Sequence, residues 1–253
     1  MVRQKQILRA LRAHQDDRLC ELRVHQGDRL AARRMTLTLL ATLAIASPLA
    51  AQAAHDPTKA VAPGALPHGW NMKLDPQDAA KTAKFVALPD GFQVTSGGAA
   101  IYYNPKDAQK DDFTLMATFR QMAKNLGHGD QGEAFGLLIA GQNLDDAAKQ
   151  TYYYFLVRQD GSFLINHRAG KDVHKIVDWK PGKAIVKFDD RKGATNDLAI
   201  KAGPDSLRFV VNNTVVHAIS RKDIDDVAGQ VGFRVNHNLD VRVTNYMVMK
   251  GGK

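Results

Sequence analysis

Short runs in which apolar and polar residues alternate fill the chain from about residue 85 to residue 249. Successive side chains of a β-strand point to opposite faces of a sheet, so this period of two predicts strands that are buried on one face. The runs are separated by turn sequences such as Pro89-Asp90-Gly91 and Gly203-Pro204-Asp205, whose residues favour tight reversals. Many short strands without helices between them predict an all-β sandwich or barrel.

Two turns are predicted to be tight hairpins with positive φ angles, Gln159-Asp160-Gly161-Ser162 and Val211-Asn212-Asn213-Thr214, because Gly and Asn adopt this conformation at little cost. A short helix is predicted at residues 75–84, where Asp75 suits the cap and Pro76 suits the first helical position. The expected strands cover residues 85–88, 92–95, 99–103, 113–121, 134–140, 152–159, 162–168, 183–189, 197–202, 206–212, 214–219, 230–236 and 240–249.

An export signal is predicted at residues 35–54. Arg33-Arg34 precede an apolar run, which is followed by Ser47-Pro48 and by small residues up to Ala54. A basic segment, an apolar segment and a small-residue cleavage site in this order are typical of a secretory signal peptide. We therefore expect a periplasmic or secreted protein whose mature chain has no membrane span. An uncleaved anchor is the alternative, because residues 37–54 are at the lower limit of length for a membrane span.

The rest of the chain divides into three parts around this signal. Residues 1–34 are basic and polar, and they are interpreted as an over-extended gene start or a disordered basic segment. Residues 55–68 contain three prolines and no periodicity, which predicts a flexible leader. Residues 69–250 are expected to form the β-sandwich domain.

Net charge gives no support to nucleic-acid binding, and cysteine content excludes thiol-based catalysis. The formal net charge is +9, but residues 1–53 hold 9 Lys and Arg against 4 Asp and Glu, which leaves 26 against 22, or +4, for the rest. So small a charge gives no reason to expect a nucleic-acid partner. The only cysteine, Cys20, lies in the segment expected to be removed, so the mature protein has neither a disulfide nor a thiolate nucleophile.

Several motifs, in this order, resemble those of a known family. They are Gly69-Trp70, FQVTSGGA from Phe92, FTLMATFR from Phe113, AFGLLI from Ala134, YYYFLVR from Tyr152, Trp179, LRFVVNN from Leu207, GQVGFRV from Gly229 and VRVTNYMV from Val241. The chain resembles the concanavalin A-like lectin/glucanase jelly roll, and within it the secreted 3-keto-glycoside hydrolase-like domains. This resemblance implies a β-sandwich of two antiparallel sheets. It does not carry over a catalytic motif: laminarinase-type members use an E-x-D-x-x-E strand, whereas Glu133 is the only glutamate after the signal.

The candidate binding site is a polar and aromatic face of three strands. In the strands at 152–159, 162–168 and 230–236, one alternating set is mainly apolar and the other is rich in Tyr, Arg and Asn. If these strands share a sheet, the second sets form one surface, and such side chains suit the C–H groups and hydroxyls of sugars. The alternative is a face that is polar only because it meets water. The candidates are Tyr152, Tyr154, Arg158, Asn166, Arg168, Arg234 and Asn236, with Trp179 as a further stacking residue.

Metal and catalytic chemistry have weaker signals. The loop with Asp130 and Glu133 offers hard oxygen ligands that suit calcium, but it matches no metal-binding motif, and no other cofactor is predicted. The histidines lack the spacing of a zinc-binding helix. The pairs Asp145-Asp146 and Asp189-Asp190 are interpreted as solvated loop residues rather than as the two carboxyl groups of a glycosidase.

These features predict an exported, non-catalytic, carbohydrate- or glycan-binding β-sandwich. A glycoside-processing hydrolase of the 3-keto type is the alternative that the resemblance implies. A structural or partner-binding domain without a small ligand is the third candidate.

Overall fold

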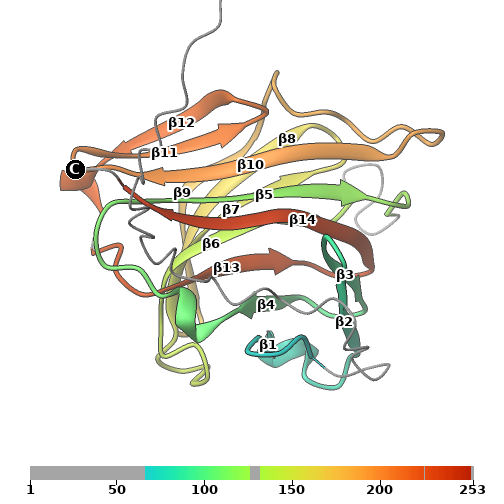
Figure 1. The fold of residues 1–253 in the computed structure, drawn as a ribbon, viewed down its shortest axis with the longest axis horizontal. Helices are drawn as coiled ribbons and strands as arrows, with labels where there is room; N and C mark the ends of the chain where they lie inside the picture. Colours follow the sequence, from blue (N-terminus) through green and yellow to red (C-terminus); the bar gives the residue numbers. More distant parts are fainter. Residues whose placement is uncertain (1–65, 126–131, 225, 252–253) are drawn as a thin grey trace, which may run out of the picture. The chain divides into compact units, whose positions relative to one another are not determined.

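The computed structural model describes residues 66–125, 132–224 and 226–251 as a sandwich of two seven-stranded antiparallel sheets (Figure 1). The predicted all-β jelly-roll class is therefore confirmed. The basic segment at 1–34, the expected signal peptide, the expected leader up to residue 65, and Asp130 lie outside the described residues. No helix among the described residues has the length and apolar character that crossing a membrane requires.

The first sheet, called sheet A, carries the candidate site. All of its neighbouring strands are antiparallel, and its edges are β1 and β9. In spatial order its strands are β1 (Asn71–Leu74), β4 (Ala100–Tyr103), β13 (Gln230–Val235), β6 (Ala134–Gln142), β7 (Thr151–Arg158), β8 (Ser162–Ala169) and β9 (Asp172–Pro181).

The second sheet, called sheet B, packs against the inner face of sheet A. The last strand of the chain, β14, lies inside sheet B between β5 and β3. In spatial order its strands are β12 (Thr214–Ser220), β11 (Ser206–Val211), β10 (Ala194–Ala202), β5 (Phe113–Gln121), β14 (Leu239–Lys250), β3 (Gly91–Ser96) and β2 (Ala83–Leu88). Single turns of 3-10 helix, η2 (Pro76–Asp78), η3 (Pro105–Asp107) and η5 (Arg221–Asp223), occur in the connections.

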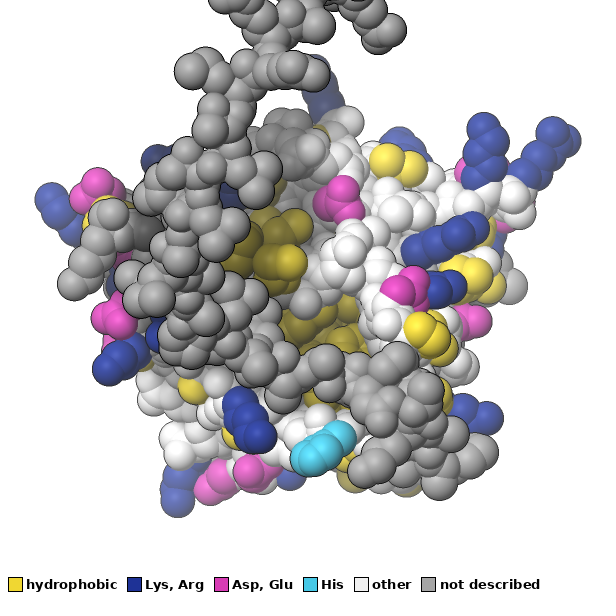
Figure 2. Space-filling model, viewed as in Figure 1, with side chains coloured by type: hydrophobic (Ala, Val, Ile, Leu, Met, Phe, Trp, Pro, Cys, Tyr) yellow, Lys and Arg dark blue, Asp and Glu magenta, His cyan; other side chains and the backbone are white. Residues whose placement is uncertain are grey.

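The main core lies between the sheets and is rich in aromatic rings. Tyr102 and Phe233 stack at 4.9 Å between ring centroids, and Trp70 meets Phe92 edge-on at 4.7 Å. Such pairs add to the free energy gained from burying their area. In Figure 2, hydrophobic side chains lie at the floor of a hollow, and Lys, Arg, Asp and Glu side chains lie around it.

Sheet A differs from sheet B because its central strands are buried on both faces. Along β5 of sheet B, buried and partly exposed residues alternate, as the period-two pattern predicts. Along β6, every residue from Ala134 to Gly141 is buried. A second apolar cluster covers the outer face of sheet A. It consists of Ile101, Tyr103, Ala134, Leu138, Leu144, Tyr152, Tyr154, Leu156 and Leu164, with Trp179 packed against it.

Both predicted hairpins are confirmed. Asn212 and Asn213 have φ angles of 47° and 64° and connect β11 to β12. Gly161, with a φ of 84°, lies in the turn from β7 to β8. These are the positive values that the turn sequences predict.

The predicted helix at 75–84 is reduced to the single turn η2, and β2 starts at Ala83. The Asp75 side chain makes no capping hydrogen bond because its carboxylate binds Arg234 instead. Without that cap, the intrinsic preference of this short segment for helix is too weak to extend the turn.

The predicted strand at 183–189 is wrong. The segment is held by side-chain amides rather than by a strand ladder: Asn196 bonds both the N–H and the C=O of Val186, and Asn212 donates to the C=O of Ala184. The sequence analysis also missed β1 and β9. The β9 strand lies at an edge, is mostly exposed and pairs with β8 through register shifts, so it lacks a clear alternation.

Candidate functional site

The structure brings six of the predicted site residues together on the outer face of sheet A. Tyr152 lies directly opposite Arg168, and Tyr154 lies opposite Asn166, in the pairing of β7 with β8. Arg234 projects from β13, which is separated from β7 by β6 alone, and its Nε donates to Oδ1 of Asn236 at 3.0 Å. Alternation along each strand places these side chains opposite the main core.

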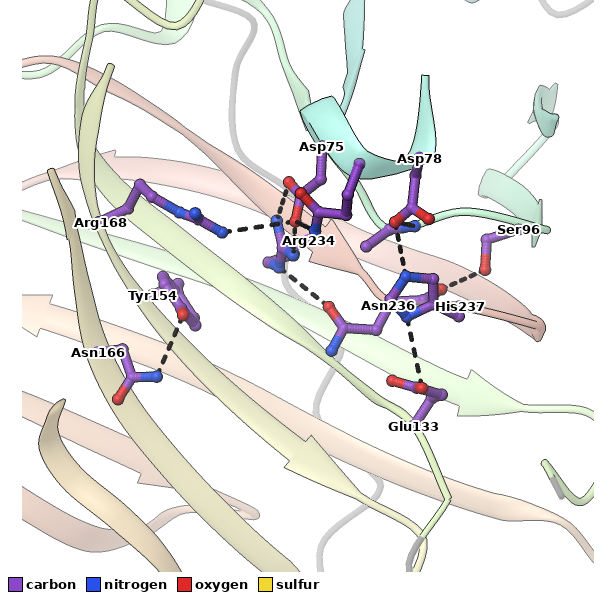
Figure 3. Close-up of polar contacts among 12 residues, drawn as sticks. Asp75, Asp78, Ser96, Glu133, Tyr154, Asn166, Arg168, Arg234, Asn236 and His237 are labelled. Atoms are coloured by element: carbon purple, nitrogen blue, oxygen red, sulfur yellow. Dashed lines mark hydrogen bonds and ion pairs between the residues drawn. The ribbon is translucent and has the colours of Figure 1, made fainter. Parts of the chain in front are cut away.

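Asp75, which the sequence analysis took for a helix cap, is the centre of this cluster (Figure 3). The two terminal nitrogens of Arg234 donate to its two carboxylate oxygens, at 2.9 and 2.6 Å. Arg168 approaches the same carboxylate more loosely, at 3.5 Å. Asp75 and Arg234 are each 5% exposed and Arg168 is 9% exposed, so two guanidinium groups share one buried carboxylate.

The charges of Asp75, Arg168 and Arg234 keep the buried Asp75–Arg234 pair ionised. Burial by itself raises the pKa of Asp75, but the hydrogen bonds and charge of Arg234, together with the charge of Arg168, outweigh burial and hold the pKa below its usual value. The pKa of Arg234 is raised despite its burial, through the nearby Tyr152 and Asp75. The carboxylate and the guanidinium therefore both stay charged at neutral pH.

The side chains of Tyr152 and Tyr154 lie beside this ion pair. Tyr152 accepts a hydrogen bond from Arg234 at 3.3 Å, and Tyr154 accepts one from Nδ2 of Asn166 at 3.1 Å. The guanidinium of Arg234 lies 5.6 Å from the centroid of the Tyr154 ring. Oδ1 of Asn166 and Nε of Arg168 are buried without a hydrogen-bond partner.

The other two predicted residues, Arg158 and Trp179, form a separate pair towards the β7–β8 hairpin. The guanidinium of Arg158 stacks on the Trp179 ring at 4.0 Å. Its Nε also donates to Asp160 at 3.0 Å and to Ser162 Oγ at 2.7 Å. Trp179 is partly exposed and packs against the apolar cluster of the outer face, so it serves both as a cover and as an aromatic surface.

A second polar cluster, missed by the sequence analysis, adjoins the first (Figure 3). Nε2 of His237 lies 2.6 Å from Asp78, and Nδ1 lies 3.4 Å from Glu133. Burial raises the pKa of Asp78, but the backbone N–H of Ala99, with Lys81 and His237, outweighs burial and lowers it. The available signal was Asp-x-x-Asp at positions 75–78, which is also typical of a helix start.

The acidic residues considered for metal or glycosidase chemistry have other contacts. Glu133 faces His237. Asp145 accepts a hydrogen bond from the Tyr103 hydroxyl at 2.7 Å, and Asp146 accepts one from the N–H of Ala148 at 2.9 Å. Among the described residues, no three His, Cys, Asp or Glu side chains are arranged to hold a metal ion.

The predicted polar surface is more deeply buried than the alternation suggests. Tyr152 is 0% exposed, and Tyr154 and Asn166 are also buried. A face that is polar only because it meets water has exposed charges, whereas these charges are paired and enclosed. A cavity of about 850 Å³ lies elsewhere, between the segment at 108–112 and Arg221 and Lys250.

The two antiparallel sheets define a jelly-roll β-sandwich. No protein-family model matches this chain, and no curated protein sequence is significantly similar. Three similar solved structures support the fold. The carbohydrate-binding module CBM66 from Bacillus subtilis is 15% identical, with 72% of this chain and 96% of that chain covered and a TM-score of 0.54.

The second is the potassium-bound carbohydrate recognition domain of Emp46p, which is 17% identical, with 73% of this chain and 90% of that chain covered and a TM-score of 0.50. The third is a Bacillus subtilis protein of unknown function with a galectin-like fold, which is 9% identical, with 72% and 89% covered and a TM-score of 0.50. At these identities the likeness is one of fold.

Proposed function

We propose that this protein is an exported, non-catalytic carbohydrate-binding protein whose ligand binds the outer face of sheet A. The export signal expected at residues 35–54 supports the periplasmic or secreted location. Two of the three similar structures named above are a carbohydrate-binding module and a carbohydrate recognition domain, which supports the ligand class.

One observation carries the proposal: Arg168 and Arg234, on different strands, converge on Asp75 directly beside two tyrosines and Asn166. Burying a charge is costly unless it is paired, so a sheet face that needed only stability would be apolar here. Planar donors and acceptors next to aromatic rings match the alternating hydroxyls and C–H faces of a sugar ring.

The test is a glycan array followed by thermal-shift measurements on the purified protein, with and without calcium. At a ligand concentration about a hundredfold above Kd, binding stabilises the native state by about 2.7 kcal/mol. For a domain of this size that raises Tm by about 5–10 °C. Arg158→Ala and Trp179→Ala should reduce the shift. Arg208→Ala, on β11 of sheet B, removes the same charge from an exposed position and should leave it unchanged.

A rise in Tm with a saccharide that is reduced in both Arg158→Ala and Trp179→Ala supports the proposal. A flat response to every saccharide, with and without calcium, contradicts it and favours the third candidate, a structural or partner-binding domain. A shift that appears only with calcium supports a calcium-dependent site.

A glycoside-processing hydrolase of the 3-keto type is the second candidate, and the Asp78–His237–Glu133 cluster favours it. An imidazole held between two carboxylates is a suitable general acid or base. The test is release of reducing sugar from 3-keto-glycosides by the protein and by His237→Ala. Turnover that disappears in this variant supports the enzyme, and its absence in the unaltered protein eliminates it.

A further inference from the structure

Two neighbouring buried polar atoms of β8, on the outer face of sheet A, lack the hydrogen bonds that such atoms require. They are Oδ1 of Asn166 and Nε of Arg168. The two residues are two positions apart on β8, so their side chains leave the same face of the strand about 6.6 Å apart. An unpaired buried donor or acceptor is costly, and native proteins keep few of them. A ligand that supplied the missing donor and acceptor here would remove that cost.

The two arginines that share Asp75 are held unequally. Arg234 occupies both oxygens of Asp75 at 2.9 and 2.6 Å, whereas the nearest contact of Arg168 to that carboxylate is 3.5 Å. Another terminal nitrogen of Arg168 reaches only the backbone oxygen of Lys171, at 3.4 Å. Two guanidinium groups share one carboxylate, and Arg168 is the weakly held partner.

The third arginine of the face, Arg158, is not weakly held. Arg158 has its own carboxylate, Asp160, at 3.0 Å. The weakly held guanidinium therefore lies on β8, next to Asn166, and not at the Trp179 end of the face. A ligand that fits must offer an acceptor of negative charge to Arg168 and a donor to Oδ1 of Asn166.

We propose that the ligand is an acidic saccharide, whose sugar carboxylate pairs with the guanidinium of Arg168 while a neighbouring hydroxyl donates to Oδ1 of Asn166. This inference rests on the proposed function and specifies its ligand class. A planar guanidinium binds a planar carboxylate through two parallel hydrogen bonds, and a uronic acid carries carboxylate and hydroxyls on one ring. A neutral sugar satisfies Asn166 but leaves Arg168 weakly held.

The experiment compares pairs of ligands that differ in one charge. Oligosaccharides of galacturonic, glucuronic and mannuronic acid, and the methyl ester of each, are titrated into the protein by calorimetry. Sulfated and neutral oligosaccharides form two further arms. We expect at least one acid to bind about tenfold or more tightly than its ester, which corresponds to one charged hydrogen bond. The difference should shrink as salt is added.

Three variants test the assigned residue. Arg168→Gln should abolish the preference for the acid over its ester. Arg168→Lys keeps the charge but lacks the planar fork, so it should retain only a small part of the preference. Arg208→Gln on sheet B is the matched control and should retain all of it. Circular dichroism and Tm confirm that the variants fold, and the tight Asp75–Arg234 pair is intact in all three.

The outcomes separate this inference from the proposed function. Equal binding of an acid and its ester, binding of neutral or sulfated saccharides alone, or a preference that survives Arg168→Gln overturns the acidic-sugar assignment and leaves carbohydrate binding in place. Failure of every saccharide to bind overturns both.

Discussion

Removing the Asp75 carboxylate is the most direct test of how the polar face is held together. In Asp75→Ala, Arg234 loses two charge-assisted hydrogen bonds, of 2.9 and 2.6 Å, in a place where it is 5% exposed. Two such bonds are worth about 3–6 kcal/mol, and breaking a buried ion pair by removing one partner costs about 3–5 kcal/mol. We therefore expect the free energy of unfolding to fall by about 3–5 kcal/mol.

The assay is urea denaturation followed by tryptophan fluorescence, supported by thermal unfolding. For a domain of this size, the loss corresponds to a decrease in Tm of about 6–20 °C. The matched control is Asp90→Ala. It removes the carboxylate partner of another arginine, Arg242, whose Nη2 donates to both Asp90 oxygens at 2.7 and 2.8 Å, but at an exposed site. Exposed ion pairs contribute little, so this variant should unfold close to the original midpoint.

The double variant Asp75→Ala/Arg234→Met completes the cycle. Because Arg234 is then no longer left as a buried charge without its partner, the double variant should be more stable than the sum of the two single losses predicts, with a coupling free energy of about 1–3 kcal/mol. A loss below about 1 kcal/mol in Asp75→Ala, or strict additivity, would show that the carboxylate does not anchor the face.

Three further predictions follow from other contacts. The pKa values of Asp75 and Asp78 are lowered in the folded state. Their contribution to stability is therefore complete above the unfolded pKa of about 4, and it is lost as pH falls through the folded pKa values. Equal Tm values at pH 6 and pH 3 would contradict this prediction. Asn212→Ala removes side-chain hydrogen bonds to Ala184, Asn196 and Asp197 at a position with a φ of 47°. It should lower the free energy of unfolding in urea by about 2–4 kcal/mol. Asn213→Gly should change this free energy little. In Gly136→Ala, the new Cβ would lie 2.1 Å from the backbone oxygen of Phe155, so a loss of about 1–3 kcal/mol or more is expected; Gly203→Ala, with its nearest neighbour at 3.6 Å, should change stability by less than about 0.5 kcal/mol.

Local sequence was enough to predict most of the strands, both hairpins and the side of the site strands that faces the core. Period-two alternation assigned Phe155, Ile165 and Phe233 to one face and Tyr154, Asn166 and Arg234 to the other, and the register confirms this assignment. Alternation is a property of neighbouring residues, so it can be read without knowing which strands pair.

The centre of the site could not be predicted in this way. Asp75 and Arg234 are 159 positions apart, and their pairing depends on where β1 and β13 lie in sheet A. The local sequence around Asp75 favours a helix cap, and only the tertiary pairing with arginine overrides that preference. The same reason explains why the strand predicted at 183–189 is wrong: asparagine side chains from elsewhere in the sequence take the place of a strand partner there.

The positions of the last two strands have a consequence for how the chain folds. β13 lies between β4 and β6, and β14 lies between β3 and β5, so each sheet stays split until the C-terminal strands arrive. Pairings this distant in sequence make folding slow. A nascent chain could therefore complete neither sheet until its synthesis is nearly finished.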